Sequence, residues 1–145
     1  MGVPTRTLLP DLPKGHRFSD ISFQLTAQDI ARYLDAVEDA NDLYLERELA
    51  PPLAVAARAL GALLDFVELP AGALHTGQEV TSHAGVPIGA TLTLVGAIAQ
   101  RSERAGVIVS IIEFEVTPAG ASGPALTGRT TLMAPADPSA AGGGA

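Results

Sequence analysis

The stretch from Leu53 to Phe66 constrains the fold of this chain more than any other feature. It is apolar nearly all round, and Arg58 and Asp65 are its only charged residues. Pro51 and Pro52 lead into it through an extended segment and favour a helix start. A helix with no polar face has to be surrounded by other parts of the protein. We therefore expect a central helix that the rest of the chain encloses.

The part of the chain after this helix has the pattern of extended structure. Apolar and polar residues alternate, and β-branched residues are frequent, as in strands with one buried face. The pattern predicts a hairpin connection at Ser102–Gly106 and four long strands, at Leu74–His83, Ala90–Arg101, Gly106–Thr117 and Pro124–Met133. In the third strand Glu113 and Glu115 alternate with apolar residues, which indicates a solvated sheet face.

A short strand and an amphipathic helix precede the central helix. Apolar residues alternate over Ile21–Leu25, and Thr26 follows as a helix N-cap with Asp29 three residues later, an approximate capping box. The helix beyond has one apolar face, made by Ile30, Tyr33, Leu34 and Val37. We expect this helix to end near Glu38 to Asn41.

Together these elements predict an α+β protein with the hot-dog fold, in which a long curved antiparallel sheet wraps around a central apolar helix. The expected parts are an irregular N-terminal lead-in at residues 1–19, a single domain at 20–134 and a disordered tail at 135–145, where Pro, Ser, Ala and Gly dominate. Because the edge strands of such a sheet need covering, we expect dimers that pair edge to edge.

The composition excludes several classes of function. The 145 residues carry a net charge of −7 and only nine scattered Lys and Arg residues, which argues against nucleic-acid binding. The absence of cysteine excludes disulfides and thiolate sites, and no His, Asp or Glu cluster has metal-ligand spacing. There is no signal-peptide pattern and no segment long enough to span a bilayer. We expect a cytoplasmic protein that uses no metal or cofactor.

A short polar segment between the two helices carries the candidate chemistry. It reads Asp39-Ala40-Asn41-Asp42-Leu43-Tyr44, and Ala50 follows six residues later. Asp and Asn also cap helices and tolerate turns, so a simple helix end explains the same residues.

This segment resembles the signature of the MaoC-like, or hydratase 2, family. That signature runs Asp, any residue, Asn, Pro, an aliphatic residue, His, five further residues, then Ala or Ser. The matching positions are Asp39, Asn41, Leu43 and Ala50. The sequence departs from the family at Glu38, Asp42 and Tyr44, where the family has Gly, Pro and His. Leu74–Glu79, with His83 and Gly89 beyond it, resembles the first long strand of the FAS1-like dehydratase branch.

The resemblance spans about residues 10–134 and implies a hydro-lyase of fatty-acid metabolism. The implied reaction adds water reversibly to a trans-2-enoyl thioester of coenzyme A or acyl carrier protein and gives the (R)-3-hydroxy product. Catalytic roles are implied for Asp39, Asn41 and Tyr44, and substrate contacts for Ala50, Pro51, Leu53, His75 and His83. A backbone N–H at the start of a buried helix can hold the thioester oxyanion.

Tyr44 leaves the enzyme status of the chain open. Histidine can accept and donate a proton near pH 7, whereas the phenol of an unperturbed tyrosine has a pKa of about 10. Losing a general base typically costs about 10²–10⁴ in rate. Three readings follow. The chain is a hydratase or dehydratase with impaired catalysis, a non-catalytic subunit that pairs with a catalytic hot-dog chain, or a hot-dog acyl-CoA thioesterase using Asp39 or Glu46.

His75 and His83 are the other candidate bases. On one ideal strand they would point to the same face about 26 Å apart, so they cannot act together within one chain. A histidine that reaches Tyr44 across a dimer interface, such as His75 or His83, would restore a base. An apolar wall beside Tyr44 would instead indicate a silent site.

Overall fold

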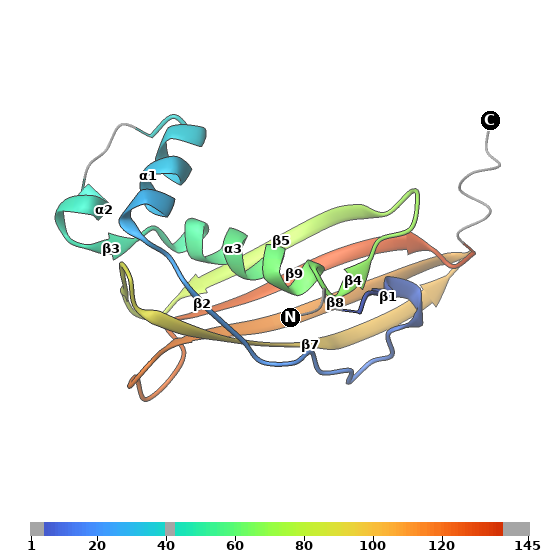
Figure 1. Ribbon diagram of the computed structural model, residues 1–145. Coiled ribbons are helices and arrows are strands. Elements are labelled where there is room, and N and C mark those ends of the chain that lie inside the picture. The colour runs from blue at the N-terminus through green and yellow to red at the C-terminus, as the bar shows by residue number, and fades with distance from the viewer. Residues whose placement is uncertain (1–4, 40–42, 138–145) are drawn as a thin grey trace.

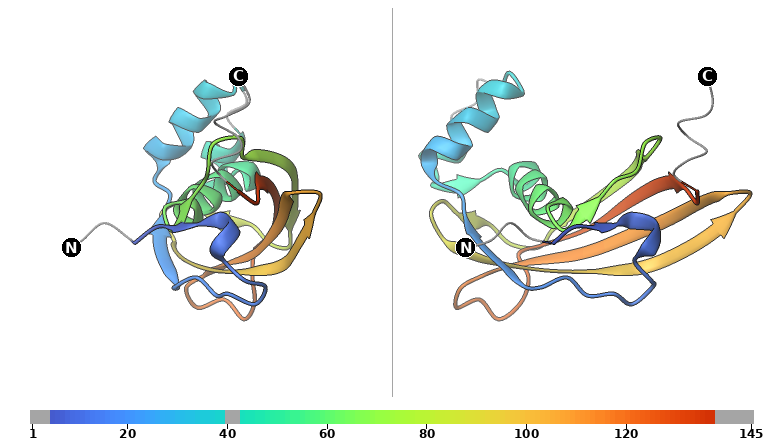
Figure 2. Two further views of the ribbon diagram at one scale, coloured as in Figure 1. Left: turned by 90° about the vertical axis from the view of Figure 1, so that its right-hand side faces the viewer. Right: turned by 45° about the vertical axis from the view of Figure 1, so that its right-hand side comes forward.

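The computed structural model describes residues 5–39 and 43–137. Its main feature is a five-stranded antiparallel sheet that curls around helix α3 (Pro52–Leu64), as Figures 1 and 2 show. The strands lie in the order β2 (Ile21–Gln24), β7 (Thr91–Arg104), β8 (Val107–Pro118), β9 (Leu126–Pro135) and β5 (Leu74–Ser82). This arrangement confirms the predicted α+β hot-dog fold.

Helix α3 fills the inside of the curled sheet because its side chains are small or apolar. Val55, Ala59 and Leu63 are completely buried. The helix comes so close to β7 that a Cβ atom on Gly96 would lie only 2.9 Å from Cδ2 of Leu63. Glycine at this position therefore sets how near the helix can lie to the sheet.

One aromatic side chain occupies the middle of the inner face. Phe114 of β8 is 2% exposed and pairs with Gly96 of β7 on one side and Gly128 of β9 on the other. A Cβ atom on Gly128 would collide with the Phe114 ring. The ring therefore lies across Gly128 and takes the space that a side chain there would fill.

The hairpin between β7 and β8 is tighter than predicted. The expected connection at Ser102–Gly106 is wrong, because the strands stay paired up to Arg104 and Val107. The turn consists of Ala105 and Gly106 alone, with φ angles of 53° and 77°. Two left-handed residues are what a two-residue hairpin requires, and alanine gives no sequence signal for that conformation.

The N-terminal lead-in contains little regular structure but belongs to the core. Strand β1 (Thr7–Leu8) pairs in parallel with β4 (Val67–Glu68), which follows α3. A single 3₁₀ turn, η1 (Leu9–Asp11), comes next. Leu9, Leu12 and Phe18 are buried in the main hydrophobic cluster, so this segment closes one end of the curled sheet.

At the other end of the chain, β9 extends to Pro135, and the N–H of Ala136 donates to the carbonyl of Gly106 at 2.8 Å. Most of the expected disordered tail, residues 138–145, lies outside the described residues.

Helix α1 (Ala27–Ala36) stands beyond the sheet at the end opposite the lead-in (Figure 1). The predicted capping box at its start is confirmed. The N–H of Asp29 donates to Oγ1 of Thr26 at 3.1 Å, and the N–H of Thr26 donates to Oδ2 of Asp29 at 2.8 Å. The hydrogen bond from the Thr26 backbone, followed by that from its side chain, lowers the pKa of the Asp29 carboxyl.

Candidate functional site

The end of α1 fixes the position of Asp39. Glu38 has a left-handed φ of 57°, and its N–H donates to the carbonyl of Asp35 at 3.1 Å. The N–H of Asp39 reaches back to the carbonyl of Leu34 at 2.8 Å. These two bonds form a Schellman motif, so the Asp39 backbone is tied to the helix. The other predicted polar residue, Asn41, lies outside the described residues.

Glycine at position 38 is expected to stabilise the protein. The left-handed conformation of Glu38 costs a residue with a side chain about 1 kcal/mol, and glycine is the usual residue at this point of the motif. Glu38→Gly should raise the free energy of unfolding, measured with urea, by about that amount. Asp35→Gly inside the same helix is the control and should lower it slightly, because glycine is a somewhat poorer helix former than aspartate. A loss of stability in Glu38→Gly would contradict the prediction.

Tyr44 and Asp39 line the same pocket. Tyr44 is half-buried in the short helix α2 (Leu43–Glu46). The pocket has a volume of about 560 Å³. Besides these two residues, its walls come from the end of α1 and the start of α3: Tyr33, Leu34, Val37, Glu38, Pro51, Pro52 and Leu53. The structure thus brings together four of the predicted site residues, Asp39, Tyr44, Pro51 and Leu53.

Large apolar side chains are exposed around this pocket. Leu53 is 61% exposed and Val37 is 52% exposed, and both line it. Exposed apolar residues around a concave pocket with a few polar groups mark a binding surface for a ligand or a partner.

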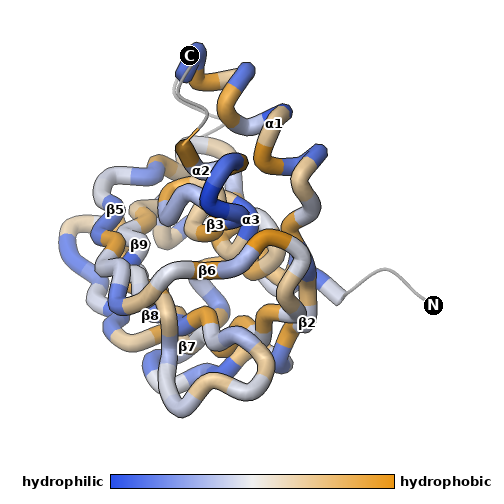
Figure 3. The backbone as a smooth tube through the Cα atoms, turned by 90° about the vertical axis from the view of Figure 1, so that its left-hand side faces the viewer, coloured by the Kyte–Doolittle hydropathy of each residue, from blue (hydrophilic) through white to orange (hydrophobic). Residues whose placement is uncertain are grey.

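A second, smaller cavity lies on the other side of Tyr44. Its volume is about 120 Å³, and Tyr44 and Pro52 border both cavities. A two-stranded ladder between β3 (Leu49–Ala50) and β6 (Val86–Pro87) brings its walls together. The remaining lining residues are mostly apolar or small: Leu49, Ala50, Ser82, Ala84, Gly85, Val86 and Leu126. Figure 3 looks onto this end of the molecule, where α2, β3 and β6 lie beside the start of α3.

The start of α3 offers a backbone donor to the larger pocket. Pro51 and Pro52 have no N–H, and the N–H groups of Ala54 and Val55 donate to the carbonyl of Pro51 at 3.0 and 3.2 Å. Leu53 therefore carries the first N–H of the helix, for which the helix has no acceptor. The positive end of the helix dipole strengthens the attraction of this group for a negative oxygen.

Neither His75 nor His83 lines either of the two pockets that Tyr44 borders, and the expectation that both point to one face is wrong. The pairing of β5 with β9 shifts by one residue between His75 and Gly77, and such a bulge reverses the direction of the side chains on one side of it. His75 is opposite Leu132, a core residue. The ring of His83 is hydrogen-bonded to Oγ1 of Thr127 at 2.9 Å, on the outer face.

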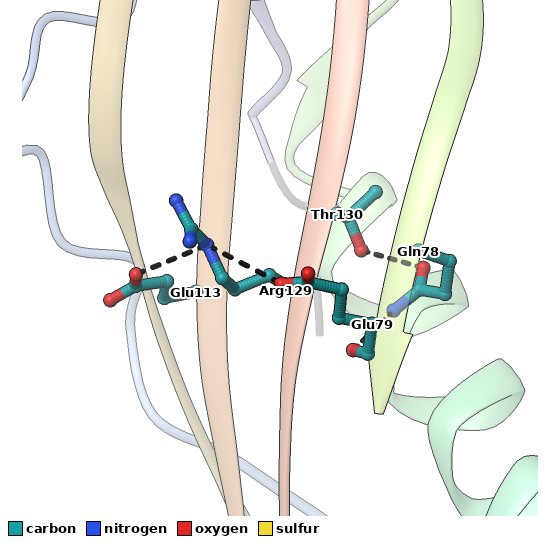
Figure 4. A network of polar contacts seen from close by, with 5 residues as sticks. All are labelled: Gln78, Glu79, Glu113, Arg129 and Thr130. Carbon is teal, nitrogen blue, oxygen red and sulfur yellow. Dashed lines mark hydrogen bonds and ion pairs between the residues drawn. The ribbon is translucent and has the colours of Figure 1, made fainter. Parts of the chain in front are cut away.

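The outer face of the sheet carries a separate group of charged side chains. Nε of Arg129 lies 3.4 Å from a carboxylate oxygen of Glu113 and 4.0 Å from one of Glu79 (Figure 4). Glu113 and Glu115 are exposed, as predicted for a solvated face. These residues border a shallow hollow of about 460 Å³ that contains none of the predicted site residues. Exposed ion pairs of this kind contribute little stability.

Two further properties concern metals and membranes. Within residues 5–39 and 43–137, no three His, Asp or Glu side chains gather in a group that could hold a metal ion. Across the same residues, every helix is too short or too polar to span a bilayer.

Several lining residues could not be found from the motif. Tyr33 and Leu34 of α1 and Val37 just after it follow the apolar pattern noted in the sequence, but that pattern equally fits plain core packing. The segment 82–86 has no feature in its sequence that predicts a place in the site, because only the pairing of β3 with β6 brings it to Tyr44.

The long antiparallel sheet curled around α3 is a hot-dog fold. The family model described as "FAS1-like, dehydratase domain region" matches residues 13–120. The chain belongs to this FAS1-like dehydratase family.

Solved structures agree on the fold. The (R)-hydratase of A. caviae involved in PHA biosynthesis has a TM-score of 0.71 and 19% identity, over 86% of this chain and 98% of that one. The R-hydratase PhaJ1 of Pseudomonas aeruginosa has a TM-score of 0.70 and 15% identity, over 86% and 83%. A chain of the HadBC 3R-hydroxyacyl-ACP dehydratase complex of Mycobacterium tuberculosis has a TM-score of 0.66 and 21% identity, over 83% and 96%. No curated protein matches the sequence.

Proposed function

We propose that this protein binds acyl thioesters in the pocket beside Tyr44 and hydrates 2-enoyl thioesters reversibly but slowly. One observation carries the proposal. Asp39 and Tyr44, the two described residues at catalytic positions of the family signature, line the same pocket at the start of α3. A volume of about 560 Å³ is in the range of small-molecule sites, and the exposed Val37 and Leu53 suit an acyl chain.

The chemistry assigns a role to each group in the pocket. Hydration joins the oxygen of water to Cβ of the enoyl group and a proton to Cα. The Asp39 carboxylate can orient the water and attract one of its protons. The Leu53 N–H can donate a hydrogen bond to the thioester oxygen, where negative charge develops as Cβ is attacked. Tyr44 can donate a hydrogen bond but is a poor base at neutral pH, so the hydration should be slow.

The test is hydration of crotonyl-CoA by the purified protein, followed by loss of the absorbance of the conjugated thioester. We expect slow hydration that Asp39→Asn abolishes, because the asparagine side chain cannot accept a proton from water. Asp35→Asn is the matched control, since Asp35 is an exposed carboxylate of α1 outside the pocket lining. Equal rates for the native protein and for Asp39→Asn would refute the role of Asp39.

The same preparation separates hydration from thioester hydrolysis. A hydratase releases no thiol, so release of free coenzyme A from saturated butyryl-CoA would instead identify a thioesterase. A protein that neither hydrates crotonyl-CoA nor releases thiol has no catalytic function of either kind.

A second candidate function is that of a non-catalytic subunit paired with a different, catalytic hot-dog chain. Tyr44 at the histidine position favours it, and the similar HadBC structure is a complex of dehydratase chains. Co-purification with a second hot-dog protein, and crotonyl-CoA hydration only by the mixture, would establish this role. Activity of the protein on its own would exclude it.

A further inference from the structure

The smaller of the two cavities beside Tyr44 is apolar and reaches into the core. Of its described lining residues only Ser82 and Tyr44 have polar side chains, and none is charged. Ala50, Val86 and Leu126 belong to the main hydrophobic cluster. An apolar cavity gives water few hydrogen-bond partners, so this space suits a hydrocarbon group better than water or an ion.

The Tyr44 side chain is the movable part of the boundary between the two cavities. Among the described residues, only Tyr44 and Pro52 line both of them. Pro52 begins α3, and its ring is closed onto its own backbone. Tyr44 belongs to the four-residue helix α2, which has no fully buried residue, and its ring turns about ordinary side-chain torsions. A substitution at position 44 can therefore join the two cavities.

The polar groups of the proposed site lie on the other side of this boundary. Asp39 lines the larger pocket, and so does Leu53, whose N–H has no acceptor within the helix. An acyl thioester held by these two groups has only its hydrocarbon tail left to extend further. A tail that extends toward the smaller cavity meets the Tyr44 ring first, because Tyr44 borders both spaces.

We propose that the Tyr44 ring limits this protein to short acyl chains, and that the smaller cavity is an acyl-chain site which the ring closes off. The inference rests on the proposed binding of acyl thioesters and specifies which of them bind. The size of the cavity sets the expected effect. A cavity of about 150 Å³ holds a benzene molecule, so one of about 120 Å³ has room for about four carbon atoms.

Removing the ring should therefore extend the bound chain by about four carbons. The probes are saturated acyl-CoA thioesters, from butyryl-CoA to decanoyl-CoA, titrated into the native protein and into Tyr44→Ala in a calorimeter. In Tyr44→Ala the Kd should fall about fourfold for each CH₂ group added from butyryl to octanoyl, as burial of that group predicts, and then level off. The native protein should bind butyryl-CoA and octanoyl-CoA with similar affinity, because the added carbons stay in water.

Three further variants separate the ring from the hydroxyl and from the rest of the larger pocket. Tyr44→Phe keeps the ring and loses the hydroxyl, so it should behave like the native protein. Tyr33→Ala removes a ring that lines the larger pocket but not the smaller cavity, so its Kd for octanoyl-CoA should stay close to that for butyryl-CoA. Tyr44→Val also lacks the ring and should repeat the result of Tyr44→Ala. It takes the place of that variant if circular dichroism shows that the alanine variant is unfolded.

Filling the opened cavity should restore the limit. Gly85 borders the smaller cavity, and a Cβ atom there would lie 3.1 Å from Cδ2 of Leu49, another lining residue. Gly85→Val combined with Tyr44→Ala should therefore return the Kd for octanoyl-CoA to that for butyryl-CoA. Gly123→Val in the same background is the matched control. A Cβ atom at position 123 meets nothing within 4 Å, and Gly123 lines neither cavity, so octanoyl-CoA should keep its tighter binding.

The outcomes separate this inference from the function on which it rests. Saturated thioesters cannot be hydrated, so their binding does not depend on catalysis. The expected Kd pattern without any hydration of crotonyl-CoA would refute the catalysis and keep the role of Tyr44. Similar Kd values for butyryl-CoA and octanoyl-CoA in Tyr44→Ala, or a fourfold gain per CH₂ group already in the native protein, would overturn the inference and leave acyl-thioester binding standing. A complete lack of acyl-CoA binding in every variant would refute both.

Discussion

Tyr44→His is expected to raise the rate of enoyl-thioester hydration by about 10²–10⁴-fold, the usual contribution of a general base. Position 44 corresponds to the histidine of the MaoC-like signature that this segment resembles, and Tyr44 lines the pocket that Asp39 also lines. An imidazole there can accept a proton from water and release it to Cα at neutral pH. The measurement is kcat/KM for crotonyl-CoA, compared with the native protein at the same pH.

Three variants show whether the gain comes from the position or from a histidine alone. Tyr44→Phe should give no gain, since it removes the hydroxyl and adds no base. Tyr33→His puts the same ring elsewhere in the same pocket and should also give none. Combining Tyr44→His with Asp39→Asn should cancel the gain if the two residues act as a pair. An equal rise in Tyr33→His would mean that position 44 has no special geometry.

Gly128→Ala is expected to destabilise the protein by about 3 kcal/mol, at the upper end of the usual cost of overfilling a core. The added methyl group would meet the Phe114 ring. That ring cannot move toward β7 without cost, because Gly96 is already covered by Leu63. Urea unfolding followed by circular dichroism measures the loss.

The control for this substitution is Gly77→Ala in the neighbouring strand β5. A Cβ atom there would lie 3.5 Å from Thr131, an ordinary contact, so the loss should be small. Phe114→Leu combined with Gly128→Ala should cost less than the sum of the two single changes, because the smaller side chain leaves room for the methyl group. Simple additivity would show that the ring is not the cause.

The sequence was sufficient to predict the layers of this fold. The central helix was predicted from its continuous apolar run, and the strands from an alternation that reveals which face is buried and that holds in β7 to β9. The residues at which the helices and strands begin and end were harder to predict. Ala105 in a left-handed turn has no sequence signal, so the β7–β8 hairpin was predicted too long. The lead-in has no helical or strand periodicity in its sequence. Leu9, Leu12 and Phe18 enter the core one at a time and do not form one face of a helix or strand, so their burial could not be predicted.

The candidate site was only partly predictable for a similar reason. Asp39 and Tyr44 come from one local motif, and a short connection keeps them near the start of α3. The residues of the smaller cavity beside Tyr44 are brought together by the pairing of Ala50 with Val86. A single sequence does not reveal such a contact. The bulge beside His75 was equally hidden, although it reverses the face on which that histidine lies.

The partner of strand β2 has a consequence for how the protein folds as it is made. Phe23 pairs with Leu92 and Ile21 with Leu94, and Arg17 bridges to Ala97. Strand β2, which is made early in synthesis, must therefore wait for its partner β7 until most of the domain has been synthesised. Closing such long-range pairs is slow, and an unpaired strand is prone to aggregate in the meantime. Substitutions that weaken β7 should thus lower the yield of folded protein more than they lower the stability of the protein that has folded.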